Sequence, residues 1–254
     1  MIRVFIGTEP KTEIARKVLC FSIEKNTSQP VEFYPMMGDS WVIRPNPYIG
    51  TGFSLFRWDI PKKCNYEGFA IYLDADILCL SDIKELWGVD TKYPNETCSV
   101  WCTYQPSKWD GKPTPETSVM LIDCKKAKEN QPSMEDSLTY ILNDPKPQSR
   151  DRYIKIMRGL KHQTLPQEIP VKFNRLNSIV RNEDNVFLHY TKEPDQPWYK
   201  PSHKFAPIWR EHLVEALKAD YVSKDEIRDA IESFVPHTPK KRGQGLHPDY
   251  KKIL

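Results

Sequence analysis

Short apolar runs alternate with amphipathic stretches along most of the chain. Residues 2–7, IRVFIG, are almost continuously apolar, which is typical of a buried strand. Residues 12–26 then repeat apolar positions at helical spacing, with Thr12 as a candidate cap, and this predicts a helix. Further apolar runs predict strands at residues 31–36, 69–73, 97–104, 118–123 and 185–190. Strands that alternate with helices indicate an α/β fold with a mainly parallel central sheet flanked by helices.

The C-terminal part of the chain has a different pattern. Helical spacing predicts two helices, over residues 205–221 and 223–234. Residues 236–254 are basic and lack apolar periodicity, so we expect a tail that is disordered or lies on the surface. There it is a candidate for peripheral contact with an anionic lipid or acceptor. We therefore expect one domain over residues 1–213, followed by a helical appendage and basic tail over residues 214–254.

Composition narrows the class of protein. Of the 254 residues, 39% are hydrophobic and 28% charged, and the net charge of +3 gives no field that favours nucleic-acid binding. No apolar run is long enough to span a bilayer, and the chain begins with a strand rather than a signal sequence. The six cysteines lie mostly in apolar runs without a C-x-x-C spacing, which predicts buried free thiols. We expect a cytoplasmic protein with no transmembrane segment and no nucleic-acid partner.

The apolar run of residues 69–73 ends in two carboxylates, Asp74 and Asp76. In an extended chain, residues i and i+2 point the same way, so both carboxylates can reach one point in space. Two close carboxylates repel each other, and a divalent cation is the simplest compensation. Oxygen ligands suit Mg²⁺ or Mn²⁺. The alternative is a pair of solvated turn residues, because aspartate is common where strands end.

Five segments resemble those of the GT-A glycosyltransferases in the same order. The resemblance is to the retaining family of glycogenin and the lipopolysaccharide galactosyltransferases (glycosyltransferase family 8). In chain order the segments are TGFSLFRWDIP, YLDADILCLSDIKELW, ETSVMLIDC, LPQEIPVKFNRL and FLHYTKEPDQPW. With the first strand, they extend the resemblance over residues 2–213. It implies the GT-A fold, the Rossmann-like fold of nucleotide-diphospho-sugar transferases.

The same resemblance implies an activity. The expected enzyme is a hexosyl- or pentosyltransferase that moves a sugar from a nucleotide-diphosphate donor to a saccharide or glycoconjugate acceptor. A UDP-sugar donor, a Mn²⁺ or Mg²⁺ cofactor and retention of the anomeric configuration are implied with it. In such a reaction the metal ion acts as a Lewis acid toward the departing diphosphate.

The resemblance also assigns roles to individual residues. It implies that His189 completes a metal site with Asp74 and Asp76. The residues expected at the donor are Thr8, Arg57, Asp74, Ala75, Asp76, Ser118 and Lys192. The planar guanidinium of Arg57 can form paired hydrogen bonds to phosphate oxygens. Glu116 and Asp151 are the candidate catalytic residues near the reacting sugar.

Three departures from the family pattern concern the donor site. Glu116 stands where the family prefers asparagine, and Ser118 replaces a glycine that lets the backbone come close. The loop HYTKEPDQPW carries Gln196 where the family has a lysine before the Pro-Trp pair. We therefore expect a different sugar specificity, with Lys192 taking part in phosphate binding.

Two other functions fit part of the pattern. A GT-A-like protein that has lost turnover would bind a carbohydrate or a partner without transferring a sugar. A phosphotransferase of the haloacid dehalogenase type also carries Asp-x-Asp after an apolar strand. In that class the motif normally continues with glycine or threonine near the start of the domain. Here it continues with Ile77 and lies far from the first residue, which disfavours this alternative.

Overall fold

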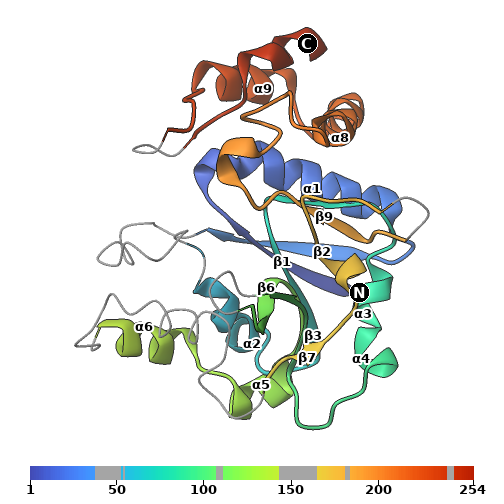
Figure 1. The fold of residues 1–254 in the computed structure, drawn as a ribbon, viewed down its shortest axis with the longest axis vertical. Coiled ribbons are helices and arrows are strands. Elements are labelled where there is room, and N and C mark those ends of the chain that lie inside the picture. The colour runs from blue at the N-terminus through green and yellow to red at the C-terminus, as the bar shows by residue number, and fades with distance from the viewer. Residues whose placement is uncertain (38–52, 54, 107–110, 143–164, 181–183, 239–242) are drawn as a thin grey trace. The chain divides into compact units, whose positions relative to one another are not determined.

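The computed structural model describes residues 1–37, 53, 55–106, 111–142, 165–180, 184–238 and 243–254 (Figure 1). These residues form two compact units whose segments alternate along the chain. Unit 1 comprises Met1–Glu9, Gln29–Asp74 and Lys84–Phe173, and unit 2 comprises Pro10–Ser28, Ala75–Ile83 and Asn174–Leu254. Each unit has its own sheet and its own hydrophobic core. The predicted domain boundary after residue 213 stays a prediction; that position lies inside the helix Ala206–Lys218.

Unit 1 is built on a six-stranded sheet with the order β2-β1-β3-β6-β5-β7 (Figure 1). Its strands are β1 (Ile2–Thr8), β2 (Val31–Met37), β3 (Phe69–Asp74), β5 (Val100–Pro106), β6 (Pro113–Asp123) and β7 (Gln167–Glu168). β1 pairs in parallel with β2 and β3, and β5 pairs in parallel with β7. β6 runs antiparallel to both β3 and β5. Parallel pairs therefore predominate, as the sequence pattern predicted.

The helical elements of unit 1 pack on both faces of this sheet. They are η2 (Phe56–Asp59), α2 (Ile60–Lys63), α3 (Lys84–Trp87), α4 (Val89–Lys92), α5 (Cys124–Asn130), α6 (Met134–Leu142) and η3 (Val171–Phe173). Trp58 of η2 and Ala127 of α5 share one buried cluster with Tyr72 and Met120 of the sheet. α5 begins where Asp123 caps the backbone N–H groups of two following residues. This packing holds β3 between its neighbours, and every side chain from Ala70 to Leu73 is fully buried.

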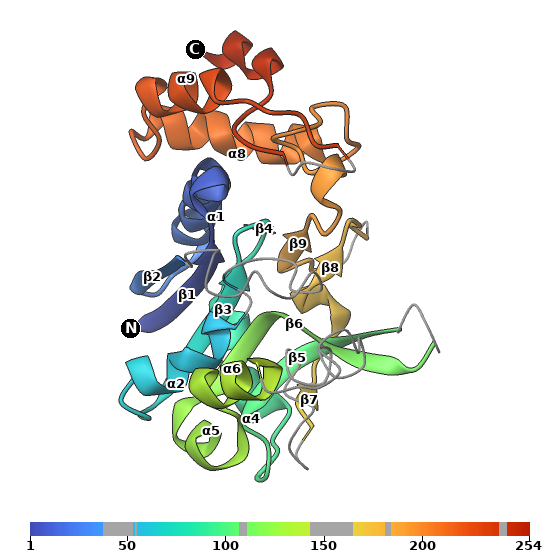
Figure 2. The ribbon, with the colours of Figure 1, turned by 90° about the vertical axis from the view of Figure 1, so that its left-hand side faces the viewer.

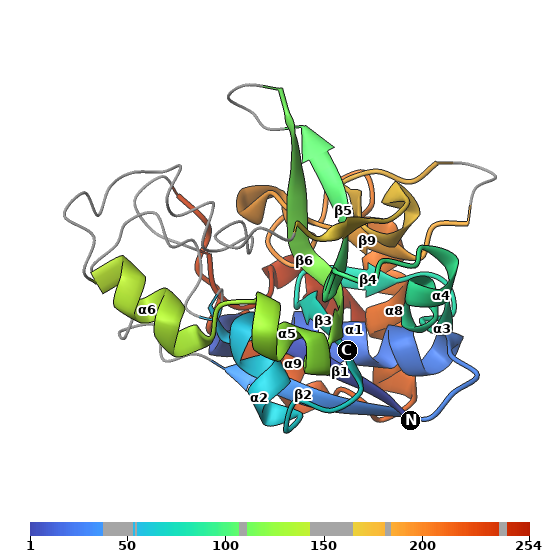
Figure 3. The same ribbon diagram turned by 90° about the horizontal axis from the view of Figure 1, so that it is seen from below.

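The pair β5 and β6 is longer than the sequence pattern indicated. The predicted strand began at Ser118, after polar and proline-rich residues. In the structure β6 begins at Pro113, and its first residues pair with the end of β5 (Figure 3). The register shifts between Trp101 and Thr103, which accommodates an irregularity in the ladder. Cross-strand pairing, which local composition does not report, extends this strand.

Unit 2 combines a small sheet with helices. The sheet has the order β4-β9-β8, from β4 (Ile77–Cys79), β9 (Phe187–His189) and β8 (Arg175–Leu176). The helical elements are η1 (Pro10–Thr12), α1 (Glu13–Asn26), η4 (Glu193–Asp195), α8 (Ala206–Lys218), α9 (Lys224–Glu232) and η5 (Pro248–Ile253). α1 packs against β4, α8 and α9, and Figure 2 shows α8 beside α9. α9 starts with a reciprocal capping box between Ser223 and Glu226.

The end of the chain corrects the expectation of a solvated tail. Within its described part, Leu246 and Tyr250 are buried in the core of unit 2. The Tyr250 hydroxyl donates a hydrogen bond to the Pro197 carbonyl at 2.9 Å. Its ring meets Trp209 edge-on, with 5.6 Å between centroids. The basic segment has four apolar side chains, Leu246, Tyr250, Ile253 and Leu254, which show no periodic pattern in the sequence but pack in or against this core.

Two further expectations concern the thiols and the membrane. All six cysteines are buried and free, as predicted. None of the helices in the described part of the chain combines the length and the apolar character needed to cross a bilayer. The cytoplasmic location stays a prediction.

Candidate functional site

The carboxylate of Asp74 stands at the carboxyl end of β3 in unit 1. Tyr72 lies two residues earlier on the same face of the strand, and its hydroxyl donates a hydrogen bond to Asp74 Oδ1. Arg57 Nη2 lies 3.4 Å from the same oxygen, and its guanidinium lies 4.6 Å above the Tyr72 ring. Asp74 is therefore oriented by a phenol and a guanidinium at once.

Arg57 is itself buried rather than free on the surface. It belongs to η2, and its side chain is only 7% exposed. Nη1 donates to the carbonyl oxygen of Thr117 at 2.6 Å and to the Thr117 hydroxyl at 2.7 Å. The guanidinium thus joins β6 to the carboxyl end of β3. Its expected role at the diphosphate stays a prediction, whereas its contact with Asp74 was not anticipated.

Other predicted donor residues gather at the same edge of the unit 1 sheet. Gly7 of β1 pairs with Asp74, so Thr8 follows directly beside the end of β3. Val119 of β6 pairs with Leu73, which places Ser118 beside that end as well. The Ser118 hydroxyl donates to Glu116 Oε1 at 3.3 Å. The carboxyl ends of β1 and β3 are where open α/β sheets bind ligands.

In unit 2, strand pairing brings Asp76 and His189 together. Ile77 of β4 pairs with His189 of β9, and the backbone N–H of Tyr190 donates to the Asp76 carbonyl at 2.9 Å. His189 Nε2 lies 3.1 Å from Asp76 Oδ1. The sequence named these two residues as metal ligands, and the ladder between β4 and β9 explains how residues far apart in the chain meet.

Each of these two side chains is held from behind by a buried amide. Asn174 Oδ1 lies 3.0 Å from His189 Nδ1, and Gln196 Nε2 donates to Asp76 Oδ2 at 2.9 Å. When His189 Nδ1 carries the proton and donates it to Asn174 Oδ1, the Nε2 lone pair faces Asp76. Sequence reasoning assigned no role to either amide. The sequence signal that could have pointed to them is that each is a polar residue inside a segment that resembles the family pattern.

The Asp76 and His189 pair fits a cation. Asp76 Oδ1 is buried and accepts no hydrogen bond from the described residues. In the tautomer with its proton on Nδ1, His189 Nε2 and this oxygen are both acceptors, and a metal ion bound to both would relieve their repulsion; in the other tautomer the Nε2 proton takes that place. One imidazole nitrogen and carboxylate oxygens are suitable ligands for a divalent transition metal.

Three further residues were predicted at the site. Ala75 is buried between the two aspartates. Lys192 is exposed and immediately precedes η4. Asp151 lies outside the described residues. The structure therefore describes what surrounds the predicted metal ligands, whereas the catalytic role of Asp151 stays a prediction.

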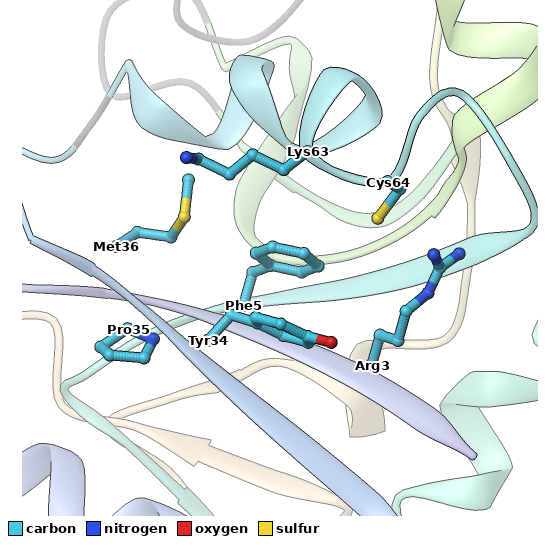
Figure 4. A pocket seen from close by; sticks show the side chains of 7 residues that line it. All are labelled: Arg3, Phe5, Tyr34, Pro35, Met36, Lys63 and Cys64. Carbon is cyan, nitrogen blue, oxygen red and sulfur yellow. The ribbon is translucent and has the colours of Figure 1, made fainter.

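A cavity of about 350 Å³ lies in unit 1 (Figure 4). It is lined by Arg3, Phe5, Tyr34, Pro35, Met36, Lys63 and Cys64. A hydrogen bond from the Cys124 thiol lowers the pKa of Cys64 to about 7, and the charge of Arg3 acts in the same direction. The same bond raises the pKa of Cys124. The cavity extends along β1 and β2 from Arg3 to Met36, which pairs with Gly7 beside Thr8.

Comparison with known proteins identifies the fold class as GT-A. The galactosyltransferase LgtC, solved in complex with donor and acceptor sugar analogs, superposes with a TM-score of 0.63 at 14% identity. The match covers 84% of this chain and 96% of LgtC. The glycosyltransferase GlyE of Streptococcus pneumoniae matches with a TM-score of 0.63 at 15% identity, over 87% of this chain and 64% of GlyE. The chain therefore has the GT-A fold that the sequence segments predicted.

A particular relative is found among the curated proteins. Protein CDI of Arabidopsis thaliana is 27% identical over 256 residues, which cover 89% of this chain and 91% of that protein. No family model matches the chain. The similarity extends along nearly the whole length of both proteins.

Proposed function

We propose that this protein is a metal-dependent glycosyltransferase that moves a sugar from a nucleotide-diphosphate donor to a saccharide or glycoconjugate acceptor. The observation that carries the proposal is the buried pair of Asp76 Oδ1 and His189 Nε2, 3.1 Å apart on a GT-A fold. A metal ion bound to both atoms would satisfy them, and a departing diphosphate needs such a cation, which supports the proposal.

Asp74 is proposed as the third ligand. It is the last residue of its segment in unit 1, and Asp76 belongs to unit 2, but only Ala75 separates them in the chain. The covalent chain alone keeps the two carboxylates near each other. Asp74, Asp76 and His189 would then offer two carboxylates and one imidazole to a divalent ion, with Mn²⁺ or Mg²⁺ as the expected identity.

The metal ion, when bound, would neutralise the diphosphate as the glycosidic bond breaks. The chain's own residues would prepare this step. Tyr72 and Arg57 orient the Asp74 carboxylate, and Asn174 fixes the ring of His189. Packing and hydrogen bonds hold these ligand side chains in place before the substrate arrives. The reaction then does not have to spend free energy on ordering them.

The remaining donor contacts extend the proposal. Thr8 would bind the nucleoside, Lys192 would bind a phosphate, and Glu116 and Ser118 would stand beside the donor sugar. The side chains of Thr8, Ser118 and Glu116 share the sheet edge where Asp74 ends β3, which supports their assignment to one ligand. A UDP-sugar donor and retention of configuration complete the proposal, by analogy with the family that the sequence resembles.

A nucleotide-release assay tests this function. The purified protein is incubated with UDP-glucose, UDP-galactose, UDP-xylose, UDP-N-acetylglucosamine and GDP-mannose, each with Mn²⁺ or with EDTA. We expect one donor to release nucleotide with Mn²⁺, and we expect Asp76→Asn to abolish the release. Asp184→Asn, which removes an exposed carboxylate, is the matched control and should release nucleotide like the unmodified protein.

The same assay separates this function from its main alternative. A donor that binds with the metal, but from which no nucleotide is released even with oligosaccharide acceptors present, would indicate a binding protein of the GT-A fold. If none of the nucleotide sugars binds by calorimetry, with or without Mn²⁺, the donor assignment is wrong.

A further inference from the structure

Gln196 is a buried polar residue in a loop that otherwise looks solvated. It lies between η4 and Trp198, and it is only 6% exposed. Its backbone carbonyl accepts hydrogen bonds from Tyr199 N at 3.0 Å and Lys200 N at 2.9 Å. These two bonds fix the backbone that follows Gln196. A long polar side chain so placed needs partners inside the protein.

The side-chain amide of Gln196 donates hydrogen bonds to two acceptors, both at strand ends of unit 2. Nε2 donates to Asp76 Oδ2 at 2.9 Å and to the Tyr190 carbonyl at 3.0 Å. A side-chain amide nitrogen carries two hydrogens, so these bonds use its full donor capacity. The Tyr190 carbonyl is itself fixed by the strand ladder, since Tyr190 N donates to the Asp76 carbonyl. The amide therefore holds the Asp76 carboxylate at a fixed position relative to the backbone of Tyr190.

The two oxygens of Asp76 consequently have different surroundings. Oδ2 accepts the bond from Gln196, whereas Oδ1 accepts no hydrogen bond from the described residues and faces His189 Nε2. A carboxylate held in this way offers one oxygen to a cation. The neutral amide also leaves the full negative charge on Asp76, whereas an ammonium group at position 196 would neutralise it.

We propose that Gln196 is a positioning residue that turns Asp76 into a one-oxygen metal ligand through Oδ1. The sequence pattern that the chain resembles has a lysine at this position, so the substitution changes a charged side chain into an internal hydrogen-bond donor. This inference rests on the proposed metal site. It adds that Gln196, in the loop segment QPW, acts on the metal through Asp76.

Metal titration without donor or acceptor tests the inference. The affinity of the full chain for Mn²⁺ is measured by calorimetry and by electron paramagnetic resonance of free Mn²⁺. Gln196→Met keeps the length of the side chain and removes both donors, and we expect it to weaken Mn²⁺ binding about 10- to 100-fold. Gln244→Met, at an exposed glutamine of the same unit, is the matched control and should bind Mn²⁺ unchanged.

A second variant guards against a simple loss of folding. Gln196→Lys retains donors for the Tyr190 carbonyl and for Asp76, but it places a positive charge beside Oδ2. We expect it to remain folded in EDTA, judged by its urea midpoint, and to bind Mn²⁺ more weakly than Gln196→Met. If the role of Gln196 is purely structural, Gln196→Met should have a lower urea midpoint. The folded Gln196→Met variant should then bind Mn²⁺ with unchanged affinity.

The outcomes distinguish this inference from the proposed function. If Asp76→Asn abolishes Mn²⁺ binding while both Gln196 variants bind like the unmodified protein, the metal site stands and the role of Gln196 is refuted. If the expected order of affinities holds but no donor releases nucleotide, Gln196 has its role and the transfer function fails. If the unmodified protein does not bind Mn²⁺, both are overturned.

Discussion

Replacing Arg57 by methionine should destabilise the protein strongly. Methionine has a similar length but cannot donate a hydrogen bond. The change removes the bonds to the carbonyl and hydroxyl of Thr117, at 2.6 and 2.7 Å, and the ion pair with Asp74 at 3.4 Å. It also removes the guanidinium charge beside the Asp74 carboxylate, which keeps its hydrogen bond from the Tyr72 hydroxyl.

The magnitude follows from burial. The side chains of Arg57 and Asp74 are 7% and 18% exposed, so solvent screens their interaction little. Breaking one partner of a buried pair typically costs 3–5 kcal/mol, and the partial exposure of Asp74 favours the lower end, about 3 kcal/mol. For a chain of this size each kcal/mol lowers the melting temperature by about 2–4 °C, so we expect a decrease of about 6–12 °C.

The assay is urea and thermal unfolding followed by circular dichroism in EDTA, which keeps divalent cations out of the comparison. Arg228→Met is the control, because Arg228 forms an exposed ion pair with Asp225 and should change the free energy of unfolding by less than about 1 kcal/mol. A loss below about 1 kcal/mol for Arg57→Met would refute the view that this guanidinium holds the end of β3.

Three further predictions concern other parts of the structure. Asn174→Leu should weaken Mn²⁺ binding about 10-fold or more in calorimetry, because the ring of His189 loses the acceptor that orients it; unchanged affinity would contradict this. Ser223→Ala removes the capping box of α9 and should lower the free energy of unfolding in urea by about 1 kcal/mol. With a pKa lowered to about 7, Cys64 should be alkylated by iodoacetamide with a rate that rises between pH 6 and 8 and then levels off. Cys20, whose pKa is raised to about 12 by burial, should stay unmodified in the same peptide mass map.

The apolar runs predicted the strands of unit 1 well where both faces are buried. Residues 2–7 and 69–73 lie within β1 and β3, because a strand with both faces buried needs a continuous apolar sequence. The start of β6 was missed, since residues 113–117 are polar or proline. They pair with β5 at the end of a long hairpin, and this depends on register and partner rather than on local composition.

The candidate site shows the same division. The aspartates at the end of β3 and the histidine in an apolar run could be named from the sequence with the help of the family resemblance. The supporting amides could not, because asparagine and glutamine in proline-rich connections are usually solvated. Only the folded chain buries Asn174 and Gln196 beside the two ligands that they hold.

The sequence by itself determined the strands that are buried on both faces and that two carboxylates follow one of them, because both are local patterns of apolar and charged residues. Tertiary structure alone decided the hydrogen-bond partners: Arg57 with Thr117, 60 residues away, and Gln196 with Asp76, 120 residues away. Burial makes each polar group depend on a partner, and the partner is set by strand pairing and packing across the fold.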